Sequence, residues 1–166
     1  MGRPDAVSHP TVHLLCGLVG VGKTTLARQI AHERDAVRFS LDAWMLRLYG
    51  RLRYDDPVYV SRLDGCKALI WDTACQVLTT GHDVVLDWNQ WSRERRAEWA
   101  SAAMQVGATP VLHFVDVSLD TAIARAASRS ASDPFSHDLD EAGVRHMATI
   151  FETPTDEEGI EIVVYS

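Results

Sequence analysis

The chain has 166 residues, a formal net charge of −7 and a hydrophobic content of 46%. This length suffices for one domain with its own core, and the apolar content is ordinary for a globular protein. The acidic balance is the opposite of the basic footprint of general nucleic-acid binders. Apolar runs are only strand-length, so no membrane span is predicted. Residues 1–10 lack the apolar core of a signal peptide, so we expect a flexible N-terminal segment and a cytoplasmic protein.

Hydrophobic periodicity predicts strands that alternate with helices along the chain. The expected strands cover residues 12–16, 36–40, 83–87, 110–116 and 159–165. The expected helices cover residues 24–34, a short stretch from 41, and then 59–80, 92–106, 118–127 and 140–152. Residues 49–60 are interpreted as an irregular insertion, and the polar residues 128–140 as a mobile loop that forms a lid. The alternation favours an α/β domain over residues 11–166, with a parallel sheet covered on both faces.

A glycine-rich segment lies between the first strand and the first helix, and residues 17–24 fit the pattern G-x-x-x-x-G-K-[ST]. Glycines let the backbone curl until its N–H groups point at phosphate oxygens. The lysine can then reach the outer phosphates, and the following hydroxyl can hold Mg²⁺. A purely structural glycine turn is the alternative, which the flanking strand and helix make less favourable. The expected nucleotide-binding residues here are Gly17, Leu18, Val19, Gly20, Val21, Gly22, Lys23, Thr24 and Thr25.

Three aspartates follow strands, and ligands of parallel sheets bind beyond the carboxyl ends of the strands. Asp42, after the second strand, could orient an acceptor hydroxyl and take its proton. Its alternative role is a helix N-cap, although Ser40 could perform that role instead. Asp87 ends the third strand and could serve Mg²⁺ or the acceptor, or simply a turn. Asp116 is its rival for the metal, but its closeness to the capping Ser118 favours a structural role.

Two arginines and several aromatic residues complete the candidate site. Arg125 and Arg129 share one helix face just before the polar loop, where they could close over a triphosphate. The alternative is an ordinary solvated helix face. Near the strand ends, Trp44 and Trp88 could wall an acceptor pocket, although packing is the more common role of large aromatics. Together with Asp42 and Asp87, these tryptophans and Asn89 are the expected acceptor-side residues, while tyrosines in the insertion would set specificity.

Several segments resemble the kinase branch of P-loop proteins that includes polynucleotide 5′-kinases, zeta-toxin-type kinases and chloramphenicol phosphotransferase. Residues 87–99 are similar to a segment of the polynucleotide kinase group that runs from Asp-x-Asn to Arg-x-x-Trp. Residues 115–120 with Arg125 and Arg129 resemble that group's fourth strand and lid helix. Residues 151–154 and 158–159 resemble the Phe–Pro and Glu-Gly motifs that precede the last strand of that group. These segments cover nearly the whole chain.

The resemblance implies an adenylate-kinase-like three-layer α/β/α sandwich with the strand order 2-3-1-4-5. It implies ATP and Mg²⁺ as cosubstrates, with Lys23 and Thr24 at the phosphates and metal. It also implies that Asp42 is the base, that Asp87 positions the acceptor or the base, and that Arg125 and Arg129 are lid arginines. Pro154 would lie near the adenine.

One departure from the resemblance concerns the acceptor. Polynucleotide kinases carry D-x-x-R after the second strand, whereas this chain has Asp42, Ala43, Trp44 and Met45. We therefore expect a small-molecule acceptor, such as an antibiotic, nucleoside or sugar-like metabolite, and regard a nucleic-acid acceptor as less favoured. The alternatives are a polynucleotide 5′-hydroxyl kinase, a toxin-type kinase and a regulatory ATPase. The sequence has no Asn-Lys-x-Asp motif, which argues against a GTPase switch.

Overall fold

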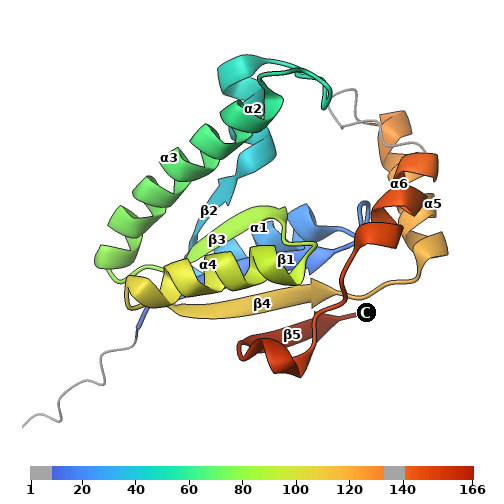
Figure 1. Cartoon of the computed structure of the whole chain (residues 1–166). Helices are drawn as coiled ribbons and strands as arrows, with labels where there is room; N and C mark the ends of the chain where they lie inside the picture. Colours follow the sequence, from blue (N-terminus) through green and yellow to red (C-terminus); the bar gives the residue numbers. More distant parts are fainter. Residues whose placement is uncertain (1–8, 133–140) are drawn as a thin grey trace, which may run out of the picture.

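The computed structural model describes residues 9–132 and 141–166, arranged around a five-stranded parallel sheet. Its order is β2-β3-β1-β4-β5, which confirms the order expected above. Strand β1 lies at the centre, between β3 and β4 (Figure 1). The strands are β1 (Thr11–Gly17), β2 (Val37–Ser40), β3 (Val84–Asn89), β4 (Thr109–Val115) and β5 (Glu161–Tyr165).

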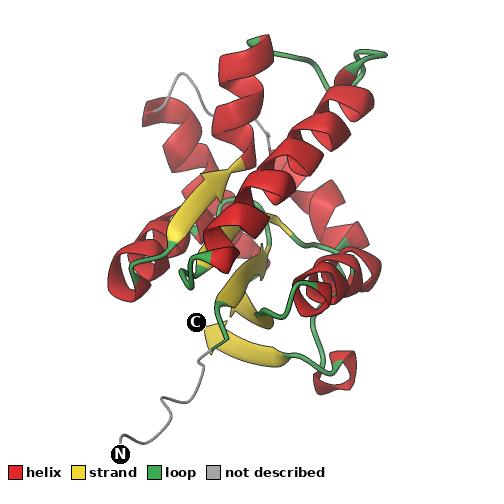
Figure 2. Ribbon diagram, turned by 90° about the vertical axis from the view of Figure 1, so that its left-hand side faces the viewer, coloured by secondary structure: helices red, strands yellow, loops and turns green. Residues whose placement is uncertain are grey.

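Helices cover both faces of the sheet (Figure 2). They bury two separate apolar clusters. One cluster packs side chains of α2, α3 and α4 on one face, and the other packs α1, α5 and α6 on the opposite face. The expected three-layer sandwich is therefore confirmed. The helices are α1 (Lys23–Arg34), α2 (Leu41–Tyr49), α3 (Tyr59–Thr79), α4 (Arg93–Gln105), α5 (Leu119–Ser132) and α6 (Glu141–Ile150).

The central strand explains why the two layers form. Val12, Leu14 and Cys16 of β1 belong to the cluster under α2, α3 and α4, whereas Leu15 belongs to the cluster under α1. All four side chains are completely buried, and successive strand residues point to opposite faces. A strand buried on both faces needs an unbroken apolar run, which is the pattern of residues 14–16.

The last third of the chain differs from the expectation in two places. Helix α5 continues through Ser132, so the loop expected from 128 does not begin there. Serine costs a helix only a few tenths of a kcal/mol per residue. Strand β5 begins only at Glu161, because a capping box between Thr155 and Glu158 folds residues 156–158 into a 3₁₀ turn. The remainder of the expected lid, 133–140, and residues 1–8 lie outside the described residues. Across the described ranges, no helix has the length and apolar character to cross a bilayer.

A chain of polar side chains crosses the sheet from Asp83, just before β3, to Tyr165 at the end of β5. His13 Nδ1 lies 2.9 Å from His113 Nε2, and His113 Nδ1 lies 2.9 Å from the Tyr165 hydroxyl. His13 Nε2 lies 3.5 Å from the Asp83 carboxylate. One proton on each Nε2 lets Tyr165 donate to His113 and His113 donate to His13. Burial lowers the pKa of His113 to about 4, with the neighbouring His13 as a smaller cause.

We expect this chain of side chains to make the fold acid-sensitive. His113 is neutral in the folded state and takes up a proton more readily when unfolded, so its contribution is complete above about pH 6.5 and is lost toward pH 4. The loss amounts to on the order of 3 kcal/mol. The free energy of unfolding is measured with urea for the wild type and for His113→Gln across this pH range. The difference between the two proteins should become smaller as the pH falls. The exposed His146→Gln is the control, and a difference independent of pH would contradict the assignment.

Candidate active site

The P-loop joins β1 to α1 and packs closely against α5. A Cβ on Gly20 would lie 2.7 Å from the carbonyl oxygen of Ala122, so only glycine fits there. Gly22 is the N-cap of α1, with a φ of 101° in the left-handed region that favours glycine. The loop therefore ends at the N-terminus of α1, where the first backbone N–H groups have no partner within the helix and can bind an anion.

Two cations contact the backbone of this loop. Lys23 Nζ donates to the carbonyl oxygens of Gly17 and Leu18, at 3.0 and 2.7 Å. Arg125 of α5 donates from Nη1 to the Val21 carbonyl oxygen at 3.0 Å. The structure thus brings Arg125 to the P-loop. Arg129 lies one helical turn further along α5, and its side chain is outside the described part of the chain.

Asp87 is the carboxylate that the structure places at the P-loop. Its side chain is 4% exposed, its Oδ1 accepts from Thr24 Oγ1 at 3.4 Å, and its Oδ2 accepts from Arg38 Nη1. Burial raises the pKa of Asp87, and the Arg38 guanidinium opposes that rise. Asp116, the rival, is exposed beyond the end of β4. The geometry favours Asp87 over Asp116 for a metal.

Arg38 was not singled out by the sequence analysis. The available signal was strand alternation: Arg38 lies two residues before Ser40 on β2, and Ser40 is in register with Asp87 on β3. That spacing puts the arginine on the same sheet face as the carboxylate.

The residues present fit Mg²⁺ only in combination with phosphate. Thr24 and Asp87 offer the oxygen ligands that Mg²⁺ prefers, and this ion is normally held by one or two protein groups plus substrate phosphates. Among the described residues, no group of three or more His, Cys, Asp or Glu could hold a metal on its own.

Asp42 is exposed near the start of α2, and the N-cap alternative for it is wrong. The N-cap is Ser40, although the Ser40 side chain makes no capping hydrogen bond. The charge of Asp42 acts on Asp87, Tyr54 and Tyr59, so these groups share one neighbourhood.

The aromatic surroundings of Asp42 differ from the expected tryptophan wall. Trp88 is 8% exposed and packs edge-on against Trp99 at 5.2 Å between ring centroids, so it belongs to the core. Trp44 is half-buried and packs edge-on against Phe39. Tyr54 and Tyr59 form an edge-on pair at 5.2 Å, and Tyr54 is 58% exposed. The tyrosines of the insertion, rather than Trp88, provide the accessible ring surface near Asp42.

Three other expected residues, Asn89, Pro154 and Thr25, have less defined roles. The side-chain oxygen of Asn89 is buried without a hydrogen-bond partner among the described residues, which marks it as an available polar group beside Asp87. Pro154 is half-buried in the segment after α6, where Phe151 stacks on Phe114 with ring centroids 6.1 Å apart. Thr25 is exposed on the first turn of α1.

Arg96 fastens the segment around Pro154 to the rest of the domain. This side chain is completely buried, and its guanidinium forms two hydrogen bonds with the Glu158 carboxylate, at 2.6 and 2.7 Å. Its Nη1 also donates to the carbonyl oxygens of Gln90 and Glu152, at 3.1 and 2.9 Å. One residue of α4 thereby joins the end of β3 to both sides of the segment before β5.

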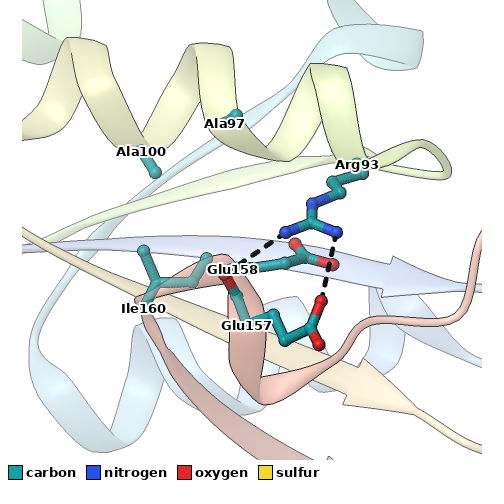
Figure 3. A pocket seen from close by; sticks show the side chains of 6 residues that line it. All are labelled: Arg93, Ala97, Ala100, Glu157, Glu158 and Ile160. Carbon is teal, nitrogen blue, oxygen red and sulfur yellow. Dashed lines mark hydrogen bonds and ion pairs between the residues drawn. The ribbon is translucent and has the colours of Figure 1, made fainter.

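A cavity of about 210 Å³ lies beside this junction, between α4 and the residues before β5 (Figure 3). Arg93 spans it, donating from Nη2 to the Glu157 carbonyl oxygen at 3.3 Å and facing the Glu157 carboxylate at 3.7 Å. None of the expected site residues lines this cavity, so the cavity is separate from the candidate site at the P-loop.

The fold and the P-loop define a nucleotide-binding domain of the P-loop kinase type. Residues 12–154 match the family described as AAA domain, and the chain belongs to that family. No curated protein matches the chain significantly.

Solved structures with the same fold include a gluconokinase, Kti12 and a chain of an RNA repair complex. A gluconokinase from Sinorhizobium meliloti 1021 is 18% identical with a TM-score of 0.62, over 94% of this chain and 83% of its own. Kti12 of Chaetomium thermophilum, in complex with ADP-AlF3, is 15% identical with a TM-score of 0.70, over 93% and 89%. A chain of the Pnkp1/Rnl/Hen1 RNA repair complex is 18% identical with a TM-score of 0.72, over 90% of this chain but only 46% of its own.

We expect Arg96→Met to destabilise the domain by about 3–5 kcal/mol, because it leaves the Glu158 carboxylate buried without its cation. Urea unfolding measures this loss. The matched control is Arg93→Met, whose partner Glu157 is exposed and whose loss should cost less than about 1 kcal/mol. The double variant Arg96→Met/Glu158→Met should lose less stability than the sum of the losses of the two single variants, Arg96→Met and Glu158→Met. Equal costs for Arg93 and Arg96 would show that burial of the pair is unimportant.

Proposed function

We propose that the chain is an ATP-dependent kinase that transfers the γ-phosphoryl group to a hydroxyl of a small molecule. The observation that carries this proposal is the position of Asp87, a buried carboxylate within 3.4 Å of the Thr24 hydroxyl, with the exposed Asp42 in the same neighbourhood. One carboxylate can serve the donor side while the other serves an acceptor, which is the division of labour that phosphoryl transfer needs.

On the donor side, the P-loop N–H groups and Lys23 bind the phosphates. Lys23 is held by carbonyl oxygens of the loop itself, so it needs only to exchange those partners for phosphate oxygens. Bound Mg²⁺ supplies neutralisation of the developing charge, and Thr24 and Asp87 are the residues that would hold it. Arg125, with Arg129 one turn away, adds positive charge from α5, and residues 128–140 are the lid in this proposal.

On the acceptor side, Asp42 orients the hydroxyl and accepts its proton. Tyr54 and Tyr59 offer ring faces to the acceptor, and a tyrosine is a neutral phenol near neutral pH. Two arginines of this region are already engaged: Arg53 pairs with Asp55, and Arg62 lies over the Tyr49 ring. A neutral, ring-bearing acceptor suits this surface better than a polynucleotide.

A screen of acceptor classes with ATP, read out as phosphorylated product by mass, tests the proposal directly. The panel contains sugars and sugar acids, nucleosides, hydroxylated antibiotics and 5′-hydroxyl oligonucleotides. Salt separates the classes, because affinity for an oligonucleotide falls steeply as salt increases and affinity for a neutral acceptor does not. Transfer to water alone, at a rate that no acceptor raises, would favour a regulatory ATPase.

We expect Lys23→Ala to abolish phosphoryl transfer and to weaken ATP binding, because the loop loses the lysine that reaches the outer phosphates. The measurement is product formation together with calorimetric ATP affinity. Lys67→Ala on α3 is the matched control and should leave both unchanged. Turnover retained in Lys23→Ala would rule out a P-loop mechanism.

We expect Asp42→Asn to reduce turnover by roughly two to four orders of magnitude while ATP affinity is retained, because the amide cannot accept the proton. Turnover and nucleotide affinity are measured separately on the same preparation. Asp72→Asn, which changes an exposed aspartate of α3, is the control. If turnover is unaffected, Asp42 only contributes a favourable charge at the first turn of α2.

A further inference from the structure

The pairing of Arg38 with Asp87 is unusual for a carboxylate that would face a metal. Asp87 divides its two oxygens, one toward the Thr24 hydroxyl and the other toward the Arg38 guanidinium. The Arg38 side chain is 25% exposed, and Asp87 is 4% exposed. A cation of the protein therefore already sits on the far oxygen of the buried carboxylate.

The charges around this point decide how a free divalent cation would be bound. Asp87 and Arg38 together are neutral, and among the residues whose charge acts on Asp87 only Asp42 adds a second negative charge. A divalent cation at Thr24 and Asp87 would lie within a few ångströms of the guanidinium and be repelled by it. Once a triphosphate is bound at the P-loop, its negative charges outweigh this repulsion.

We propose that Arg38 is a built-in counter-cation of Asp87 that makes divalent-cation binding conditional on the phosphates of the nucleotide. This inference rests on the proposed function, because a triphosphate must be the ligand of the P-loop. Arg38 is a positioning residue: it holds the Asp87 carboxylate with one oxygen toward Thr24, and its charge keeps that carboxylate from collecting metal alone.

Two effects of removing Arg38 oppose each other, and their sizes differ. Loss of the positive charge should strengthen cation binding by more than about tenfold, even with the effective dielectric constant near 20 that applies to protein sites. Loss of the bond that orients Asp87 frees one short side chain and should weaken binding by only about two- to fivefold. The charge effect is larger, so the net result is tighter binding.

The experiment measures binding of Mn²⁺, a paramagnetic substitute for Mg²⁺, by electron spin resonance without nucleotide. We expect Arg38→Met to bind Mn²⁺ at least about tenfold more tightly than the wild type. Adding Asp87→Asn to this variant should remove the gain, and Arg38→Lys, which keeps the charge, should bind as weakly as the wild type. Arg47→Met on α2 removes an exposed arginine and is the matched control. With ATP analogue present, wild type and Arg38→Met should both bind Mn²⁺.

Each outcome decides between the proposals. If wild type and Arg38→Met have equal Mn²⁺ affinity without nucleotide, and both proteins bind nucleotide in a separate measurement, the role of Arg38 is overturned and the proposed function is not. A wild type that binds no nucleotide overturns the proposed function and this inference with it. If Arg38→Met does not fold, Arg38→Gln replaces it. The wild type decides independently, since tight binding of Mn²⁺ without nucleotide would contradict the proposal.

Discussion

The buried guanidinium of Arg96 is the constraint on which the arrangement of the outer segments depends. It is completely buried, pairs with Glu158 and binds two backbone carbonyl oxygens, from Gln90 and Glu152. A charge in this position is stable only if every one of these partners stays in place, because an unpaired buried ion costs several kcal/mol. The end of β3, the start of α4 and the segment before β5 therefore have a single mutual arrangement. That arrangement fixes the segment of Pro154 relative to the P-loop.

The site places positive side chains on one side of the sheet end and carboxylates on the other. The P-loop side carries Lys23 and Arg125, which are held by backbone carbonyl oxygens. The other side carries two carboxylates, of which the buried Asp87 is neutralised by Arg38 and the exposed Asp42 has solvent around it. Charges held in this way require little reorganisation when a ligand of opposite charge arrives, which is the general condition for electrostatic stabilisation of a transition state.

Local periodicity predicted a parallel sheet covered on both faces, and glycines at set spacing predicted the position of the P-loop. The strand order was predicted only from the resemblance to P-loop kinases, because no local pattern specifies which strands are neighbours. The sequence did not predict the partners of Arg38, His13 or Arg96, whose contacts lie 49, 100 and 62 residues away in the chain. No local pattern encodes such pairings. Trp88 shows a second difficulty, since the same aromatic residue at a strand end suits either a pocket or the core, and only packing against Trp99 decides. The polar composition after 127 suggested a loop, but helix α5 continues through Ser132, because each serine costs a helix only a few tenths of a kcal/mol.

The strand order also indicates which segments of this domain tolerate sequence changes and which do not. The P-loop leaves the central strand, which is hydrogen-bonded on both sides, whereas Asp42 follows β2 at the edge of the sheet. Insertions or sequence drift after an edge strand disturb one ladder only, so a new acceptor pocket can arise there while the donor pocket is unaltered. For a protein engineer, residues 41–60 are accordingly the place to graft or randomise, with the remaining domain serving as a fixed nucleotide-binding scaffold.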